Sequence, residues 1–368
     1  MLTLNMIVKN EVRVIERCLA SVRPFVGRWV IVDTGSTDGT QEVIREFLRG
    51  IPGELYSVPF IDFATTRTEA VRLCRKATGA QGHALTIDAD EVLVCDPGFD
   101  PIEFQHSLIH DLYYVEVRCG NLHYYRSLIF SMARPWQYRG VVHEFLHCHE
   151  EFTSDTARGF HLVPWPDGAR SSDPKKYVKD AKAIEEALER ESDPAMVNRY
   201  FFYLGQCYRD AGEFLKAYEA FRERGKADGW LEEKAVALMN AGKCLLVAKG
   251  SEGLDRAVTM FLDSHLVAPH RVEPLYMAAR AYRMQGRFDQ AYKLARMGLG
   301  ISRPTRGLFL MPEVYEWGMA EEYGLACYWT NRHAEAVQIF ENLLNSGLLS
   351  EQDSKRMKLN KLLAEGRL

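Results

Sequence analysis

Three acidic residues follow directly on a short apolar stretch in the first half of the chain. Residues 84–87 have the pattern of a buried strand, and Asp88, Asp90 and Glu91 come next. Unpaired carboxylates are costly in a core, so they belong at the carboxyl edge of a parallel sheet, where open α/β folds bind ligands. Mg²⁺ and Mn²⁺ prefer one or two carboxylates with phosphate oxygens. The spacing therefore predicts a Mg²⁺ or Mn²⁺ site on Asp90 and Asp88, and the alternative is a solvated acidic turn.

A second carboxylate follows another apolar stretch, residues 29–32. Asp33 begins the sequence DTGSTDGT, which contains two glycines and ends at Thr40. This sequence matches neither of the common phosphate-binding patterns, GxGxxG and GxxxxGK(S/T). An aspartate at the end of a strand is suited to hydrogen bonds with a nucleobase N–H or with ribose hydroxyls. The alternative is a capped start of the helix expected over 41–48, which explains residues 36–38 well and Asp33 poorly.

Residues 143–147 read HEFLH and formally match HExxH, the signature of zinc proteases. That chemistry needs both histidines on one face of a helix, but Gly140 and the β-branched residues after it do not favour a helix. A second interpretation is that His143 completes the shell of the metal ion and that Glu144 is a general base, with Glu91 as the other candidate base. The third is that His143 and Glu144 are only a hydrogen-bonded pair in the wall of the domain.

The elements that have to position these residues alternate between strands and helices. Residues 2–8 are almost continuously apolar and predict a strand, a helical pattern follows over 14–22, and residues 29–32 predict a second strand. A third strand is expected over 54–59. A strand, a helix and a parallel strand form the start of an α/β fold.

Arg67 stands in the first turn of a helix expected over 64–77, where a guanidinium can reach a base or a diphosphate. Further along, two alternating stretches, 112–120 and 122–132, predict a hairpin whose strands are joined near Gly120 and Asn121.

Four segments in this order resemble the family 2 glycosyltransferases of GT-A fold: KNE after the first strand, IVDTGSTDGT, FIDFATTRTEAV and LTIDADE. The resemblance covers residues 1–95, and the later VHE of residues 142–144 is similar to a segment of bacterial members. It implies an α/β GT-A (Rossmann-like) nucleotide-sugar domain. In that family the donor nucleotide would be bound by Val8, Glu11, Asp33, Arg67 and Asp88, and the metal ion by Asp90, Asp88 and His143.

The second half of the chain is helical and repetitive. Small and aromatic residues recur at the spacing of tetratricopeptide units over residues 204–340. Helices over 175–191 and 354–363 are expected to cap the two ends. The interval 300–317 is too long for a repeat turn, and it is either a contact with the catalytic domain or a second subunit, or a packed surface loop.

These boundaries predict a GT-A domain over residues 1–166, a linker over 167–174, and a tetratricopeptide-like α-helical domain over 175–368. The whole chain has 368 residues and a formal net charge of −4, which gives no general attraction to nucleic acid or anionic lipid. Its 8 cysteines form no CxxC pair, which suits a reducing compartment. Without a membrane span or signal peptide in the sequence, we expect a cytoplasmic protein.

Together the motifs and the resemblance predict a bacterial, metal-dependent, inverting glycosyltransferase. It would move a sugar from a nucleotide-diphosphate donor, a UDP- or GDP-sugar, to a peptide, protein or saccharide acceptor. The architecture resembles that of bacteriocin S-glycosyltransferases, which favours a polypeptide acceptor, and the repeats would also allow a homodimer. The alternative is a catalytically inactive tetratricopeptide-repeat binding scaffold, and the third interpretation is an HExxH zinc hydrolase.

Overall fold

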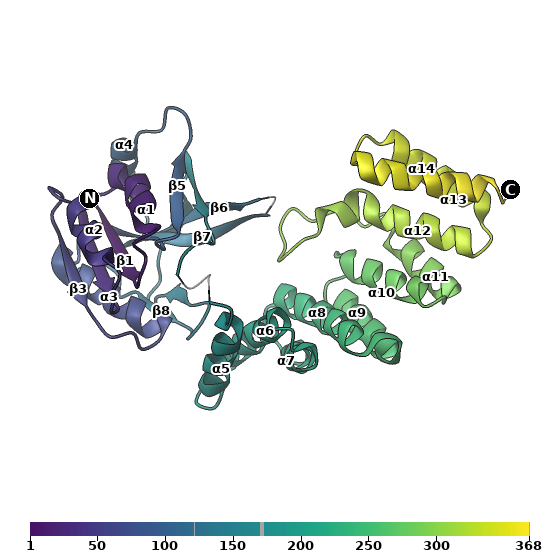
Figure 1. Cartoon of the computed structure of the whole chain (residues 1–368), viewed down its shortest axis with the longest axis horizontal. Helices are drawn as coiled ribbons and strands as arrows, with labels where there is room; N and C mark the ends of the chain where they lie inside the picture. The colour runs from purple at the N-terminus through teal and green to yellow at the C-terminus, as the bar shows by residue number, and fades with distance from the viewer. Residues whose placement is uncertain (121, 170–172, 368) are drawn as a thin grey trace. The chain divides into compact units, whose positions relative to one another are not determined.

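The chain forms two compact units, Met1–Lys179 and Asp180–Leu368 (Figure 1). The computed structural model describes residues 1–120, 122–169 and 173–367. Position 121 of the predicted hairpin turn and positions 170–172 of the predicted linker lie outside the described residues. All eight cysteines are free thiols, and those at positions 95 and 119 are exposed.

The first unit consists of a large mixed sheet with helices on both faces. Its strands are β1 (Leu2–Val8), β2 (Arg28–Asp33), β3 (Gly53–Ser57), β4 (His83–Thr86), β5 (Glu91–Cys95), β6 (Leu112–Cys119), β7 (Leu122–Ser131), β8 (Gln137–Arg139), β9 (Phe145–His147), β10 (Ser154–Thr156) and β11 (Phe160–Pro164). Its helices are α1 (Ile15–Val22), the short 3₁₀ turn η1 (Arg23–Phe25), α2 (Thr40–Phe47), α3 (Phe63–Thr78) and α4 (Pro101–His106).

The order of strands in the main sheet is β3-β2-β1-β4-β7-β6-β11-β5, with β10 beside β6, and β8 and β9 form a separate ribbon. The neighbours β3, β2, β1 and β4 are parallel, as the predicted β-α-β start requires. The hairpin β6–β7 then joins this part antiparallel to β4. The carboxyl ends of β1, β2 and β4 therefore meet at one edge, where Val8 pairs with Asp33.

The strands are buried because both faces of the sheet are covered. One face packs against α1 and α2 through residues such as Leu4, Met6 and Ile31, and the other packs against α3 through Val30 and Val32. This arrangement explains why residues 2–8 are apolar almost without interruption.

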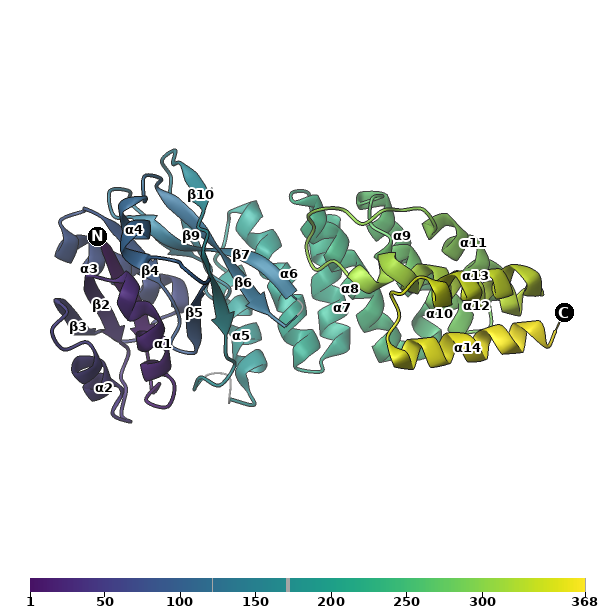
Figure 2. The same cartoon turned by 90° about the horizontal axis from the view of Figure 1, so that it is seen from above.

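In the described part of the second unit, all the regular secondary structure is helical. Its helices are α6 (Pro194–Asp210), α7 (Phe214–Lys226), α8 (Leu231–Lys249), the turn η2 (Gly250–Gly253), α9 (Leu254–Val267), α10 (Glu273–Met284), α11 (Phe288–Gly298), the π-helical turn η3 (Val314–Gly318), α12 (Met319–Trp329), α13 (His333–Asn345) and α14 (Glu351–Glu365). Helix α5 (Lys176–Leu188) crosses the boundary between the units. Figure 2 shows α6 to α13 as successive antiparallel pairs.

The pairs α6–α7, α8–α9 and α12–α13 are each closed by a glycine that faces an aromatic ring. A β-carbon at Gly205 would meet the ring of Phe221 at 2.6 Å, and one at Gly242 would meet the ring of Phe261 at 2.6 Å. Gly324 faces Phe340 in the same way. The sequence pattern of small and aromatic residues thus corresponds to real helix contacts, which is the packing of tetratricopeptide units.

Helices account for about half of the chain, and they are the regular secondary structure of the described part of the second unit. No helix in the described ranges has the length and apolar composition that a bilayer crossing requires.

Candidate functional site

Arg67 lies at the centre of a charged cluster at the carboxyl edge of the first unit. It projects from α3, whose first turn is capped by the carboxylate of Asp62. Only 8% of Arg67 is exposed. Its Nη2 donates to the carboxylate of Asp88, and its Nε donates to Oε1 of Glu144 at 2.6 Å. Three predicted site residues from distant parts of the sequence therefore meet, and the buried guanidinium is balanced by two carboxylates.

Glu91 is bound by a second arginine, Arg126 on β7. Nη1 and Nη2 of Arg126 donate to the two carboxylate oxygens of Glu91 at 2.5 and 3.1 Å. The main-chain N–H of Asp88 donates to the same carboxylate at 3.0 Å. Burial raises the pKa of Glu91, and the guanidinium opposes that shift. Glu91 and Glu144, the two predicted general bases, are thus each held by an arginine.

The Arg126 partnership was missed from the sequence. The sequence held a signal for it, because Arg126 is the one arginine in β7, a strand with mostly apolar and aromatic residues. Such a residue needs a partner of opposite charge when it is buried.

Asp90 and Glu11 lie beneath the segment 165–169. The N–H of Trp165 donates to the carbonyl of Asp90 at 2.8 Å, and the N–H of Ala169 donates to the Glu11 carboxylate at 3.2 Å. A β-carbon at Gly168 would meet Oδ2 of Asp90 at 2.7 Å, so only glycine allows this close approach.

Burial and neighbouring negative charge act on both carboxyl groups under this segment. Burial raises the pKa of Glu11 to about 7, and the carboxylates of Asp90 and Asp88 add to the shift. Burial and the Asp88 carboxylate also raise the pKa of Asp90. The predicted linker begins at residue 167, so its first residues in fact form part of the wall of this cluster.

Asp33 organises the loop that follows it. Its carboxylate accepts hydrogen bonds from the N–H groups of Gly35 and Ser36 at 3.1 and 3.0 Å, and from Nε2 of Gln41 at 2.7 Å. The carbonyl of Val8 accepts from the N–H of Thr34 at 2.9 Å. Both residues hold the loop onto the sheet, and their predicted contact with a nucleotide stays a prediction.

The histidine of the HExxH match is not on a helix. His143 has a φ of 53° and precedes β9, which contains His147. A zinc hydrolase needs the two histidines one helical turn apart, so the structure excludes the third interpretation. In the described residues, no three His, Cys, Asp or Glu side chains are grouped to hold a metal ion. Asp90, Asp88 and His143 therefore do not form a ready set of three ligands for Mg²⁺ or Mn²⁺.

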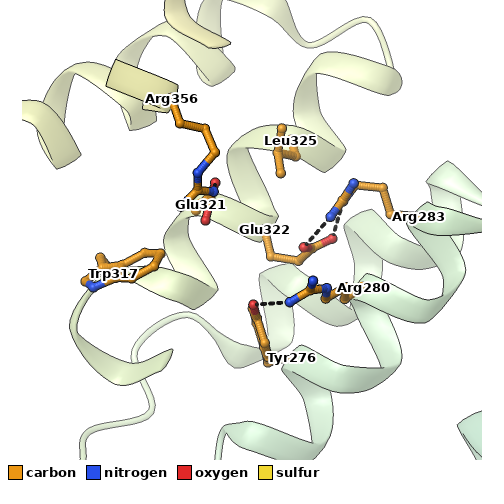
Figure 3. Close-up of a pocket in the computed structure, with 8 residues that line it drawn as sticks. All are labelled: Tyr276, Arg280, Arg283, Trp317, Glu321, Glu322, Leu325 and Arg356. Atoms are coloured by element: carbon orange, nitrogen blue, oxygen red, sulfur yellow. Dashed lines mark hydrogen bonds and ion pairs between the residues drawn. The ribbon is translucent and has the colours of Figure 1, made fainter. Parts of the chain in front are cut away.

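The second unit contains a pocket of about 250 Å³ between α10, η3, α12 and α14. It is lined by Tyr276, Arg280, Arg283, Trp317, Glu321, Glu322, Leu325 and Arg356, which point toward a common space in Figure 3. Arg283 donates to both oxygens of Glu322 at 2.5 and 3.0 Å, and Arg356 is paired with Glu321. Arg280 is exposed and donates to the hydroxyl of Tyr276 at 3.1 Å. No sequence motif pointed to this pocket, because its residues come from separate helices.

The chain is similar to known tetratricopeptide-repeat proteins. A TPR repeat-containing protein of Synechococcus elongatus is 24% identical over 310 residues, which cover 81% of this chain and 74% of the relative. Because the second unit is only about half of the chain, this match extends into the first unit. No protein-family model matches the chain.

Solved structures of repeat proteins align with about half of the chain. The structure of MamA has a TM-score of 0.38 at 18% identity and covers 49% of this chain and 92% of its own. A tetratricopeptide repeat protein from Parabacteroides merdae has a TM-score of 0.39 at 14% identity and covers 52% of this chain and 68% of its own.

These comparisons correct the sequence-based identification. The prediction of a family 2 glycosyltransferase with a GT-A fold is wrong, because the relative that spans both units is a repeat protein by name. The enzyme class and the nucleotide-sugar chemistry inferred from that resemblance are wrong with it. The findings support the alternative, a tetratricopeptide-repeat scaffold, and the helical half of the fold prediction agrees with it. The base roles of Glu144 and Glu91 stay predictions, and in the structure an arginine holds each carboxylate.

Proposed function

We propose that this chain is a binding scaffold whose repeat unit holds an acidic polypeptide segment in the pocket between α10, α12 and α14. The stacked helix pairs support this proposal, because such arrays present extended surfaces that bind other polypeptides. The single observation that carries it is the pocket itself, with three arginines against two glutamates and aromatic rings in its wall.

The charges of the pocket favour a carboxylate as the group that enters it. Glu322 is satisfied by Arg283, and Glu321 is paired with Arg356. Arg280 is exposed, and its contact within the pocket is with the neutral hydroxyl of Tyr276. A guanidinium offers paired donors that match a carboxylate. The Trp317 ring, which already lies 5.7 Å from the guanidinium of Arg356, adds an apolar wall for the stem of the incoming side chain.

The test is fluorescence anisotropy of a labelled glutamate- and leucine-rich decapeptide with the full chain, beside a matched peptide in which lysine replaces glutamate. We expect binding of the acidic peptide alone, weakened at least fivefold by Arg280→Ala. Arg296→Ala, an exposed arginine of α11 outside the pocket, is the control and should leave binding unchanged. Equal binding of both peptides, or no effect of Arg280→Ala, would overturn the assignment of the pocket.

The other expected partners stay predictions. They are Mg²⁺ or Mn²⁺ and a nucleotide-sugar donor at the Arg67 cluster, a saccharide as the other acceptor, and a second copy of the chain through the repeats. A cytoplasmic location is likewise a prediction from the free thiols. A thermal shift with Mn²⁺ and each nucleoside diphosphate, repeated on Asp90→Asn, tests the first pair, and light scattering tests the second copy.

A further inference from the structure

The longest connection in the second unit, residues 299–313 between α11 and η3, is tied back onto the repeat array. We call its central part, residues 308–311, the strap. Leu308 packs against the hydrophobic core shared by α8, α9 and α10. The structure therefore favours the packed-loop interpretation of the 300–317 interval, with the strap held by the unit's own helices.

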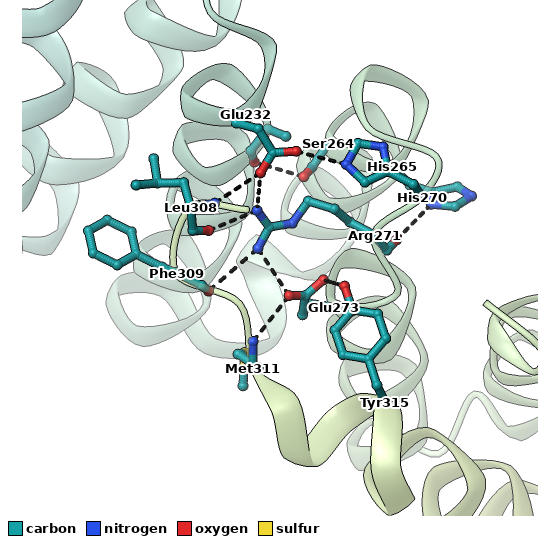
Figure 4. Close-up of polar contacts among 11 residues, drawn as sticks. Glu232, Ser264, His265, His270, Arg271, Glu273, Leu308, Phe309, Met311 and Tyr315 are labelled. Atoms are coloured by element: carbon teal, nitrogen blue, oxygen red, sulfur yellow. Dashed lines mark hydrogen bonds and ion pairs between the residues drawn. The ribbon is translucent and has the colours of Figure 1, made fainter. Parts of the chain in front are cut away.

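A buried arginine between two glutamates holds the strap (Figure 4). Arg271, with 1% of its surface exposed, donates from Nη1 to Glu232 at 2.8 Å and from Nη2 to Glu273 at 3.0 Å. We call these three residues the clamp. Glu232 stands in the first turn of α8, and Glu273 begins α10.

The clamp contacts the main chain of the strap through both donors and acceptors. Arg271 donates to the carbonyls of Leu308 and Phe309 at 2.8 and 3.4 Å. In return, the N–H of Leu308 donates to Glu232 at 3.1 Å, and the N–H of Met311 donates to Glu273 at 3.2 Å. Residues 308 and 309 lie in a turn, so these are contacts that a polypeptide with the same turn can make with its backbone.

The chemistry of the clamp defines what can occupy it. Two carboxylates and one guanidinium leave an excess of negative charge, which disfavours phosphate and nucleic acid. Buried charges of this kind need hydrogen-bond partners. Tyr315 and His270 each contact one of the two carboxylates, and the other partners are main-chain N–H and C=O groups of the strap. The Leu308 position adds an apolar anchor.

One residue of the strap, Phe309, has a strained backbone conformation. Phe309 has a φ of 50°, in the left-handed region that non-glycine residues rarely adopt. Its side chain is 47% exposed, so the ring contributes little burial in exchange. Strain of this kind persists where the surrounding contacts enforce it, and it clusters at ligand clamps and switch regions.

We propose that the clamp is a binding site for a polypeptide segment of a partner protein that forms the same turn as the strap, and that the strap is a built-in occupant which the partner displaces. The recognised segment has a leucine at the Leu308 position and fits best with glycine at the Phe309 position. This inference deepens the proposed scaffold function, and it concerns a site with none of the residues that line the acidic-peptide pocket.

The test uses the full chain with residues 305–311 replaced by a glycine-serine linker of equal length. The probe is a fluorescein-labelled peptide with the sequence of residues 303–313. A strap in the same chain competes at a millimolar effective concentration, so we expect the replaced chain to bind the probe at least tenfold more tightly than the unaltered chain. A probe carrying Phe309→Gly should bind about fivefold more tightly still, and a probe carrying Leu308→Asp should not bind.

The control separates the two sites. Arg280→Ala should leave binding of the strap peptide unchanged, whereas Glu232→Gln in the replaced chain should weaken it. The inference is overturned if the replaced chain is folded but does not bind the probe, or if it binds the Leu308→Asp probe as tightly as the original probe. Either result leaves the proposal for the acidic-peptide pocket unaffected.

Hydrogen exchange on the unaltered chain covers the case in which the replaced chain fails to fold. The amides of Leu308 and Met311 should exchange through local opening, faster than the amides of α8 and α10, and Leu308→Ala should accelerate them further. Exchange of these two amides only at the rate of global unfolding would show that the strap is a fixed part of the fold and would overturn the inference.

Discussion

Gly205 of α6 lies against the ring of Phe221 of α7, so closely that a β-carbon at position 205 would be 2.6 Å from a ring carbon. Alanine normally favours a helix over glycine by about 1 kcal/mol, but here the added methyl has to displace a buried ring. We expect Gly205→Ala to lower the free energy of unfolding by about 1–3 kcal/mol. Urea denaturation measures it. Gly366→Ala is the control, since the nearest atom to a β-carbon there is at an ordinary 3.5 Å. A gain in stability from Gly205→Ala would contradict the prediction and would show that α6 and α7 can move apart at little cost.

Arg224 and Glu233 form a buried ion pair between α7 and α8, with 2.6 Å between Nε and Oε1. Removing one partner leaves a buried charge, so Glu233→Leu should cost about 3–5 kcal/mol of unfolding free energy. The double variant Arg224→Met with Glu233→Leu should recover most of this loss, because it buries no charge. A double-mutant cycle by urea denaturation gives the coupling, and additive effects would contradict the prediction.

Arg67 neutralises Asp88 and Glu144 at the edge of the first unit. We expect Arg67→Met to destabilise the chain by about 3 kcal/mol, since the Glu144 carboxylate would stay largely buried without its partner. The matched control is Arg72→Met, which removes an exposed ion pair with Glu69 on the same helix and should cost under about 1 kcal/mol. Thermal unfolding of both variants checks the difference. Equal effects would mean that the Arg67 cluster is well solvated.

Glu11 should make the stability of the chain depend on pH. Burial raises its pKa from 4.5 to about 7 in the folded state, so its contribution is fully present below pH 4.5 and is lost as the pH rises to about 7. Glu11→Gln removes this loss and keeps an oxygen for the N–H of Ala169. The quantity to compare is the unfolding free energy of the variant minus that of the unaltered chain. We expect this difference to be larger at pH 8 than at pH 4.5 by on the order of 1 kcal/mol.

Urea midpoints at the two pH values test this prediction. Glu16→Gln, an exposed glutamate of α1, is the control and should show no such gain. A gain of equal size for the two variants would assign the effect to the net charge of the chain rather than to the burial of Glu11.

The secondary structure was largely readable because local periodicity reports burial. The apolar run over 2–8 is β1, and the helix expected over 64–77 is α3 with bounds Phe63–Thr78. The small and aromatic residues of the repeats also lie where their spacing placed them, as Gly205 and Phe221 do.

The function was not readable in the same way. Short acidic motifs at strand ends, such as Asp88 to Glu91, are compatible with a metal site and equally with structural ion pairs. The structure places Arg67 and Arg126 on these carboxylates, and the relative that spans both units is a repeat protein. These short motifs were therefore not sufficient to identify an enzyme family.

The alternation of strands and helices in the first unit and the repeated helix pairs of the second could be read from the sequence, because both follow from the spacing of apolar residues along the chain. The pairing of the charged residues depends on the folded structure. Arg67 and Glu144 are 77 positions apart, and Glu232 and Leu308 are 76 apart. Contacts over such separations depend on how the elements pack, and no local pattern of residue types specifies that packing.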